Sequence, residues 1–180
     1  MRKVVIGVTG SIAAYKAAEL ARLFVKNGDE VRVMMTKAAC EFVSPLTFKT
    51  LTRASVSVDT FDSPGKWEIA HVSLADWADF IVIAPATANT IAKMRMGIAD
   101  NLLTSVVLAA KFPIAVAPAM NCGMWRNPAT VENIAVLKSR GVKVIGPATG
   151  FLACGVEDEG RMVEPEAIMD VANSIAGGAN

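Results

Sequence analysis

The chain has 180 residues, 53% of them hydrophobic, and its 18 Lys and Arg against 17 Asp and Glu leave a net charge of +1. No apolar run reaches the roughly 18 residues of a membrane helix, and no basic stripe suggests binding to nucleic acid or to a membrane surface. Three scattered cysteines and a single histidine make neither a disulfide framework nor a set of metal ligands, so we expect no metal.

The predicted elements alternate between strands and helices. In chain order they are strands at 3–9 and 30–35 flanking a helix at 12–26, a strand at 80–84, a helix at 101–110, a strand at 114–117, a helix at 131–139, a strand at 142–145 and a helix at 165–175. Continuous apolar strands that alternate with helices indicate a parallel sheet covered on both faces. We therefore expect a three-layer, doubly wound α/β fold, with one domain at 1–176 and a frayed tail or linker start at 177–180.

Three further segments stand outside this alternation. Residues 56–66 are rich in turn formers and predict a surface excursion, whereas 146–161 is Gly-rich, lacks periodicity and predicts a long loop without regular structure. The segment 71–77 predicts a short helix. Because the first strand pattern begins at the third residue, no signal peptide is visible, which predicts a cytoplasmic protein.

The loop after the first predicted strand, Gly7–Ile12, offers a site for an anion, since ligands of doubly wound sheets bind at the carboxyl ends of the strands. Gly10 lets the backbone approach a ligand, and the N–H groups near Ser11 suit a phosphate. An ordinary tight turn in which Ser11 caps the helix is the alternative. The full G-x-G-x-x-G pattern is absent, and Thr36-Lys37 stands where an NAD site would carry an acidic residue.

Two further post-strand loops carry polar groups. In 85–90, two threonines and an asparagine can form hydrogen bonds, and a helix cap would need only one of them, which favours a ligand site. In 118–125, Asn121 offers both a donor and an acceptor, so it can hold a carboxylate or an amide. A turn asparagine flanked by core-filling methionines explains the same loop equally well.

Two side chains are candidates for proton transfer. His71, the only histidine, belongs to the residue type that titrates near neutral pH and is the first candidate for a general base, although a lone histidine is more often a surface or satisfied core residue. Cys154 stands beside a glycine in the long loop and could act as nucleophile or proton donor, whereas most free cysteines are buried and inert.

Together these motifs resemble the flavin-containing cysteine decarboxylases, and most closely their phosphopantothenoylcysteine decarboxylase branch. The matching segments run in the family's order and span nearly the whole chain: Gly10 to Lys16, His71 to Leu74 with Trp77 to Asp79, 85–90, 118–125, Ala153 to Gly155, and Gly160 to Met162. The Pro-Ala-Met-Asn-x-x-Met loop is the most specific piece, because it separates this branch from the flavin prenyltransferases.

The resemblance implies a Rossmann-like flavoprotein in which FMN lies at a subunit interface, within a homotrimer or a multiple of trimers such as a dodecamer. Such an interface would also account for the apolar excess of the composition. Residues of four post-strand loops would contact FMN, the first four of them on its phosphate side and the last near the ring: Gly10, Ser11, Ile12, Thr36, Thr87, Ala88, Asn89, Thr90 and Ala119.

The resemblance also implies the residues that meet the substrate. They are His71 as base, Cys154 as acid, Asn121 on the substrate carboxylate, and Met124, Ala153, Arg161 and Met162 around the substrate. The segment 153–162 would be a flap that closes over the pocket. The family's flap usually carries another glycine where this chain has Val156 to Glu159, a departure that concerns the flap's conformation and its fit to the substrate.

The implied activity is that of a carboxy-lyase, the FMN-dependent conversion of 4'-phosphopantothenoylcysteine to 4'-phosphopantetheine in coenzyme A synthesis. Oxidation of the thiol-bearing carbon to a thioaldehyde would place the carboxylate β to an electron sink. Carbon dioxide then leaves, and a returned hydride with a proton from an acid gives the thiol product. Many bacterial relatives continue into a ligase domain that makes the cysteine adduct, so the chain is either a stand-alone decarboxylase or one domain of such a fusion.

Alternatives from other classes stay open. A peptidyl-cysteine decarboxylase or a flavin prenyltransferase would share the fold and the flavin, and a non-catalytic regulatory subunit would share the fold alone. The presence of a base, a substrate asparagine and an acid favours an active enzyme. A generic nucleotide-binding protein would leave Asn121 and Cys154 without a role.

Overall fold

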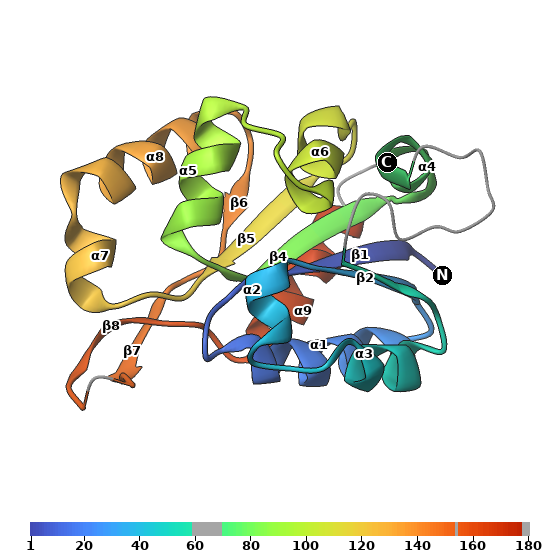
Figure 1. The fold of residues 1–180 in the computed structure, drawn as a ribbon, viewed down its shortest axis with the longest axis horizontal. Coiled ribbons are helices and arrows are strands. Elements are labelled where there is room, and N and C mark those ends of the chain that lie inside the picture. The colour runs from blue at the N-terminus through green and yellow to red at the C-terminus, as the bar shows by residue number, and fades with distance from the viewer. Residues whose placement is uncertain (59–69, 154, 178–180) are drawn as a thin grey trace.

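A computed structural model describes residues 1–58, 70–153 and 155–177, and its centre is a six-stranded parallel sheet (Figure 1). The strands are β1 (Lys3–Val8), β2 (Glu30–Met35), β3 (Val56–Ser57), β4 (Phe80–Ala86), β5 (Ile114–Pro118) and β6 (Lys143–Val144). They lie in the order β3-β2-β1-β4-β5-β6, and every neighbouring pair is parallel. The strand order reverses between β1 and β4, which is where such sheets form a ligand crevice.

Helices cover both faces of this sheet (Figure 1). One face carries α1 (Ala14–Lys26), α3 (Pro45–Thr52) and α9 (Pro165–Gly177), and the other carries α4 (Ala70–Trp77), α5 (Ala88–Met96), α6 (Leu102–Ala109) and α8 (Pro128–Ser139). Two short helices, α2 (Lys37–Cys40) and α7 (Cys122–Arg126), follow β2 and β5. The predicted three-layer, doubly wound α/β fold is confirmed. No helix in the described part of the chain is long and apolar enough to cross a membrane.

The central strands are apolar throughout because both of their faces pack against helices. Along β1, Val4 and Ile6 join the core beneath α1 and α9, while Val5 joins the core beneath α4, α5, α6 and α8. β4 alternates in the same way, with Val82 on the first side and Ile81 on the second. All five side chains are fully buried, and burial of this kind contributes about 1.5–3 kcal/mol per aliphatic side chain.

The segment 146–161 differs from its prediction. We expected a loop without regular structure, but the chain forms an antiparallel hairpin of β7 (Ala148–Phe151) and β8 (Glu157–Arg161). The prediction was wrong because it rested on apolar periodicity, and this hairpin lies apart from the main sheet (Figure 1). Its order comes from backbone pairing and from Arg126 on α7, whose Nη1 donates to Oδ2 of Asp158 on β8 (3.0 Å).

Several predicted boundaries shift by a few residues. The first helix begins at Ala14 with Ala13 at its N-cap, so Ser11 does not cap it; the Ser11 hydroxyl oxygen accepts a hydrogen bond from the Ala13 N–H instead (3.3 Å). The helices α5 and α7 were not predicted as separate elements. Of the proposed surface excursion, 56–57 form the edge strand β3 and 59–69 lie outside the described residues.

The C-terminal boundary also differs. α9 includes Gly177, where we expected the tail to begin, and residues 178–180 lie outside the described part of the chain. The predicted division of the chain at this point therefore stays a prediction.

A partly buried ion pair joins Arg2, just before β1, to Asp29 in the turn before β2. Arg2 donates from Nε and Nη2 to Asp29 (3.0 and 2.6 Å), and Asn27 donates from Nδ2 (3.0 Å). Burial alone would raise the pKa of the Asp29 carboxyl, but the hydrogen bonds from Arg2 and Asn27 outweigh it and hold that pKa below its ordinary value. A carboxyl with a depressed pKa stabilises the fold above its unfolded-state pKa of about 4, and this contribution is lost as the pH falls through the folded pKa.

We expect Asp29→Asn to lower the free energy of unfolding at pH 7 by roughly 1.5–3 kcal/mol, the range for hydrogen bonds to charged groups. Urea titrations of both proteins measure the difference, which should hold from pH 7 to about pH 5 and narrow below that. Glu19→Gln, which removes an exposed pair with Arg22 on α1, is the matched control and should change stability little. An Asp29→Asn protein as stable as the parent at pH 7 would contradict this view of the pair.

Candidate active site

A pocket of about 570 Å³ opens at the carboxyl ends of β1, β2, β4 and β5, and we call it the strand-end pocket. Its volume falls within the roughly 300–1,000 Å³ of ordinary small-molecule sites. The strand order brings these four ends together although they are far apart along the chain (Figure 1). All nine residues predicted to contact FMN line this pocket, together with Thr9, Ala38, Phe42, Lys93, Asn101, Met120 and Met124.

Thr9 joins the loops that follow β1 and β4. It is buried, its hydroxyl donates to the carbonyl of Pro85 (2.7 Å), and the same oxygen accepts from the N–H of Thr87 (3.0 Å). Thr87 in turn caps α5 by accepting from the N–H of Thr90 (3.4 Å). The cap proposed as the simpler explanation of this loop is therefore present, and the capping residues also line the pocket.

The loop after β1 is closely packed against α2. A Cβ atom on Gly10 would lie 2.5 Å from the Cβ of Ala38 and 3.1 Å from its carbonyl carbon, so only glycine fits there without a shift. Thr36 begins α2, and its hydroxyl oxygen accepts from the N–H of Ala39 (3.2 Å). These contacts fix the distance between two walls of the strand-end pocket.

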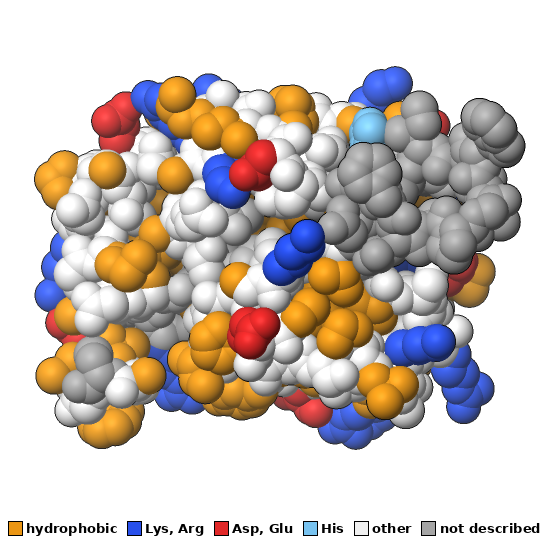
Figure 2. Space-filling view, in the orientation of Figure 1, with side chains coloured by type: hydrophobic (Ala, Val, Ile, Leu, Met, Phe, Trp, Pro, Cys, Tyr) orange, Lys and Arg blue, Asp and Glu red, His pale blue; other side chains and the backbone are white. Residues whose placement is uncertain are grey.

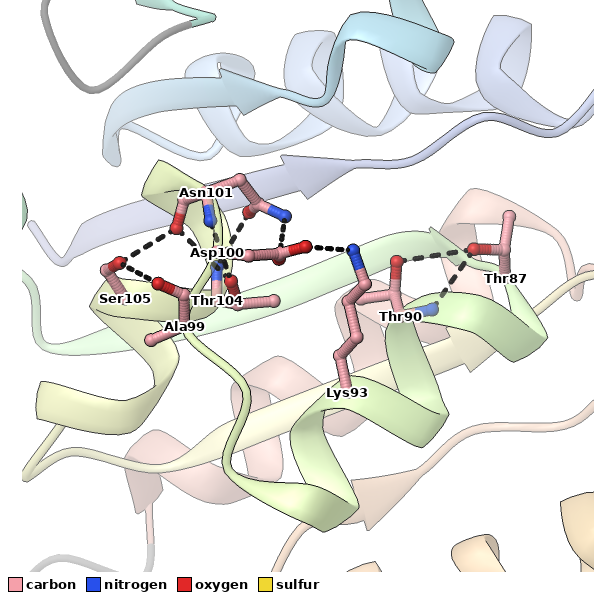
Figure 3. Close-up of polar contacts among 8 residues, drawn as sticks. All are labelled: Thr87, Thr90, Lys93, Ala99, Asp100, Asn101, Thr104 and Ser105. Carbon is pink, nitrogen blue, oxygen red and sulfur yellow. Dashed lines mark hydrogen bonds and ion pairs between the residues drawn. The ribbon is translucent and has the colours of Figure 1, made fainter.

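Among the described residues that line the strand-end pocket, Lys93 alone carries a charged side chain. It lies one turn after Thr90 on α5, and its Nζ donates to Oδ2 of Asp100, in the segment before α6 (2.6 Å; Figure 3). This hydrogen bond lowers the pKa of the Asp100 carboxyl. Asn101 caps α6 and donates from Nδ2 to Asp100 (3.0 Å), so the wall between α5 and α6 is a connected polar network.

A second pocket of about 510 Å³ lies between the first loop and the β7–β8 hairpin, and we call it the hairpin pocket. It shares a wall with the strand-end pocket, because four residues line both: Ser11, Ile12, Ala119 and Met120. Of the residues predicted to contact the substrate, the hairpin pocket is lined by Asn121, Ala153, Arg161 and Met162. Met124 lies on the strand-end pocket instead.

Asn121 has a structural role as well as a place on the pocket wall. Its Oδ1 accepts from the N–H of Gly123 (2.8 Å), which makes it the N-cap of α7. Both explanations of this loop are thus compatible, since a capping asparagine can also face a ligand.

The hairpin is docked onto the loop after β5 by a close backbone contact. The N–H of Met120 donates to the carbonyl of Gly160 on β8 (3.0 Å). Gly160 has φ +138°, and a Cβ there would collide with the Met120 carbonyl oxygen, so the position requires glycine. This contact fixes the β8 side of the hairpin pocket.

Of the two predicted proton-transfer residues, the structure describes only His71, and it does not bring this residue to either pocket. His71 lies on α4 and lines neither pocket, and α4 lies at the opposite end of the molecule from β7 and β8 (Figure 1). Its Nδ1 is buried and has no hydrogen-bond partner among the described residues. Cys154 lies outside the described residues, although its neighbours Ala153 and Gly155 line the hairpin pocket.

Sequence reasoning missed several lining residues. For Lys93 a signal existed, because residues three apart on a helix share a face and Thr90 was already a candidate. Thr9 stood in the first loop but looked like a strand residue. Phe42 lines the strand-end pocket from the turn after α2 and gave no signal, because a single apolar residue in a turn is commonplace. Lys16 lines the hairpin pocket and belongs to the matching segment Gly10 to Lys16, but nothing in the sequence pointed to a pocket role for its side chain.

The strand-end pocket combines hydroxyl and amide side chains with apolar ones such as Ile12 and Phe42. This arrangement suits a ligand with a polar or anionic part and an apolar body. Among the described residues, no group of three or more His, Cys, Asp or Glu is placed to hold a metal ion.

Comparisons with known proteins agree with this geometry. The chain matches the family model described as Flavoprotein over residues 1–177. It is 49% identical over 171 residues to the coenzyme A biosynthesis bifunctional protein CoaBC of Bacillus subtilis. The aligned region covers 95% of this chain but only 42% of that protein.

Two solved structures are similar over nearly their whole length. A PPC decarboxylase variant complexed with pantothenoylaminoethenethiol has a TM-score of 0.89 and 34% identity, covering 98% of this chain and 99% of that one. The FMN-dependent cysteine decarboxylase SpaF has a TM-score of 0.85 and 32% identity, covering 98% of each chain. The chain belongs to the Flavoprotein family.

Proposed function

We propose that this chain is an FMN-dependent decarboxylase that converts 4'-phosphopantothenoylcysteine to 4'-phosphopantetheine. The observation that carries the proposal is the shared wall of the two pockets, where residues such as Ser11 and Ala119 face both. A cofactor in the strand-end pocket and a substrate in the hairpin pocket would meet at this wall. The similarity to a PPC decarboxylase over nearly the whole of both chains supports the same activity.

The strand-end pocket fits FMN in its chemistry. The first turn of α5 lines it, and a helix N-terminus attracts a phosphate. Ser11 and Thr36 add hydroxyl groups, Lys93 adds a positive charge, and apolar side chains offer contacts to a flat ring. The close approach of Gly10 to Ala38 leaves a narrow, defined cradle.

We expect Gly10→Ala to weaken FMN binding by about 1–3 kcal/mol, roughly 5- to 150-fold in Kd, which is the usual cost of overpacking. The added methyl group would push the loop and α2 apart. Fluorescence titration of the flavin-free protein with FMN measures the change. The double variant Gly10→Ala with Ala38→Gly should recover part of the affinity, because it removes the nearest of the close contacts, the one with the Ala38 Cβ. Equal FMN affinity in the parent and Gly10→Ala proteins would contradict the cradle.

The chain's own residues have three roles in this proposal. FMN, when bound, supplies reversible uptake of a hydride equivalent. Asn121 orients the substrate carboxylate, His71 takes a proton from the substrate, and Cys154 returns one to the enethiolate that remains after carbon dioxide leaves. No nicotinamide is consumed, because the cycle returns the hydride it removes.

We further propose that the active form is a homotrimer or a multiple of trimers in the cytoplasm, and that a neighbouring subunit supplies His71. The absence of His71 from both pockets of the described chain supports this. Ile12, Phe42 and Met124 line the strand-end pocket yet are 59%, 49% and 49% exposed, and Figure 2 shows hydrophobic side chains in patches on one face. A subunit interface would cover such surface.

The relation to a second activity is also a proposal. The curated relatives are described as bifunctional, and this chain spans about two fifths of their length. We propose that residues 1–176 form the decarboxylase unit, fused to or cooperating with a ligase that makes the cysteine adduct.

A direct assay tests the proposed function. Protein loaded with FMN should release carbon dioxide from 4'-phosphopantothenoylcysteine and form one thiol product per carbon dioxide, without NAD. Protein stripped of flavin should be inactive and should recover when FMN is added. Full activity in the stripped protein, or none in the loaded protein, would contradict the proposal.

The likeness to SpaF favours one second candidate, a decarboxylase of another cysteine-containing substrate. A peptide ending in cysteine, offered in competition with 4'-phosphopantothenoylcysteine, separates the two. Preferential turnover of the peptide would move the assignment to this candidate.

A further inference from the structure

The hairpin pocket has an unbalanced charge. The charged residues that line it in the described part of the chain are Lys16 and Arg161, and both are basic. The remaining lining residues are polar or apolar, so the pocket presents cations to whatever enters it.

Both cations share one oxygen of one carboxylate. Lys16 Nζ donates to Oε1 of Glu164 (2.9 Å), and Arg161 Nη2 donates to the same atom (2.6 Å). The hydrogen bond from Lys16 lowers the pKa of the Glu164 carboxyl, so this group is ionised at neutral pH. Two cations and one anion leave one positive charge in excess, and Glu164 itself lies outside the pocket lining.

The two cations differ in their access to a ligand. Lys16 is 5% exposed, and its Nζ also donates to the carbonyl of Met162 (3.0 Å), so it is held inside the structure. The Arg161 side chain is 43% exposed and passes over Gly150 on β7. A Cβ atom added to Gly150 would lie only 3.1 Å from Nη1 of Arg161. Within the described residues, no hydrogen bond engages Nε or Nη1 of Arg161. A guanidinium with free donors is well matched to a phosphate.

We propose that Arg161, positioned by Glu164 and supported by the charge of Lys16, is the subsite for the terminal phosphate of the substrate. The inference rests on the proposed function, because it assigns a partner to the phosphate that the substrate carries. Asn121, on the loop after β5, remains the partner of the carboxylate. The hairpin thus selects a phosphorylated substrate over its dephosphorylated form and over a cysteine peptide.

Ligand binding tests this subsite without turnover. Calorimetry on the FMN-loaded protein should show 4'-phosphopantetheine binding at least about tenfold more tightly than pantetheine, the size expected for a charge-assisted contact. Arg161→Gln should remove this preference, and Arg161→Lys should restore part of it. Arg126→Gln, which breaks the ion pair between α7 and Asp158 on the hairpin but changes no residue that lines the pocket, should leave the ratio of the two affinities unchanged.

A second test compares the kinetics of the phosphorylated substrate with those of its dephosphorylated form. Arg161→Gln should raise KM for 4'-phosphopantothenoylcysteine about tenfold and leave KM for pantothenoylcysteine unchanged. If the variant raised both equally, Arg161 would bind the carboxylate that both substrates share, and the proposal would be overturned; an unchanged preference for the phosphorylated ligand would overturn it as well. If the parent protein decarboxylated neither substrate, the proposed function would fail, while the calorimetric comparison would still decide the subsite.

Discussion

Replacing His71 with asparagine is expected to lower the rate of decarboxylation by roughly 10²–10⁴-fold, the usual contribution of a general acid or base. Asparagine keeps a similar polar shape but cannot take a proton near neutral pH. The nine residues proposed to contact FMN are unaltered in this variant, so it should still bind the flavin. Initial rates of carbon dioxide release, divided by the flavin content of each preparation, measure the effect.

The same variant tests whether the site is shared between subunits. Two inactive chains, one with His71→Asn and one with Asn121→Asp, can be co-expressed with different tags and purified through both. If each site combines His71 of one subunit with Asn121 of another, the mixed oligomers should regain part of the activity. Mixed oligomers that stay inactive would place His71 and Asn121 of the same chain in one site, and an active His71→Asn protein would remove the residue from the mechanism.

Replacing Cys154 with serine is expected to separate carbon dioxide release from product formation. A hydroxyl is a far weaker acid than a thiol, so protonation of the enethiolate should slow by roughly 10²–10⁴-fold while the preceding steps continue. In a single turnover, carbon dioxide should appear at close to the normal rate and the saturated thiol product should lag far behind. Quenched reactions analysed by mass spectrometry would show a product lighter by two hydrogen atoms.

A matched cysteine makes the Cys154 result specific. Cys122 on α7 is half-buried and lines neither pocket, so Cys122→Ser should leave the ratio of carbon dioxide to final product at one. If Cys154→Ser formed the saturated product at the normal rate, the acid would have to be another group.

Much of the fold and of the strand-end pocket could be predicted from the sequence, for one physical reason. A strand buried on both faces leaves a continuous apolar run, as in Val4 to Ile6, and helices between such runs require parallel strands. Parallel strands end at one edge, so loops as distant in sequence as those holding Ser11 and Ala119 are forced together. The nine predicted cofactor residues line one pocket as a result.

The hairpin could not be predicted in this way. The residues from Glu157 to Gly160 have no apolar alternation, because the hairpin is not part of the main sheet and buries little. Its position depends on the contact of Gly160 with Met120, which joins segments 40 residues apart and leaves no periodic trace. The shared ion pair of Lys16 and Arg161 with Glu164 could not be predicted for the same reason. Lys16 lies in the first helix, far from the other two residues in the sequence, and only the fold brings them together.

The position of His71 lay beyond sequence reasoning as well. The prediction of a short helix at 71–77 is confirmed by α4, but α4 is far from the hairpin in the folded chain (Figure 1). Contacts between subunits carry no helical or strand period, so if His71 acts on a neighbouring subunit, as we propose, one sequence could not have paired it with that site.

The most direct measurement is the absorption spectrum of the purified protein, followed by identification of any chromophore released on denaturation. We expect the bands of an oxidised flavin, FMN as the released compound, and about one FMN per chain. A colourless protein that also failed to take up added FMN would contradict a flavin site in the strand-end pocket, and with it the decarboxylase function.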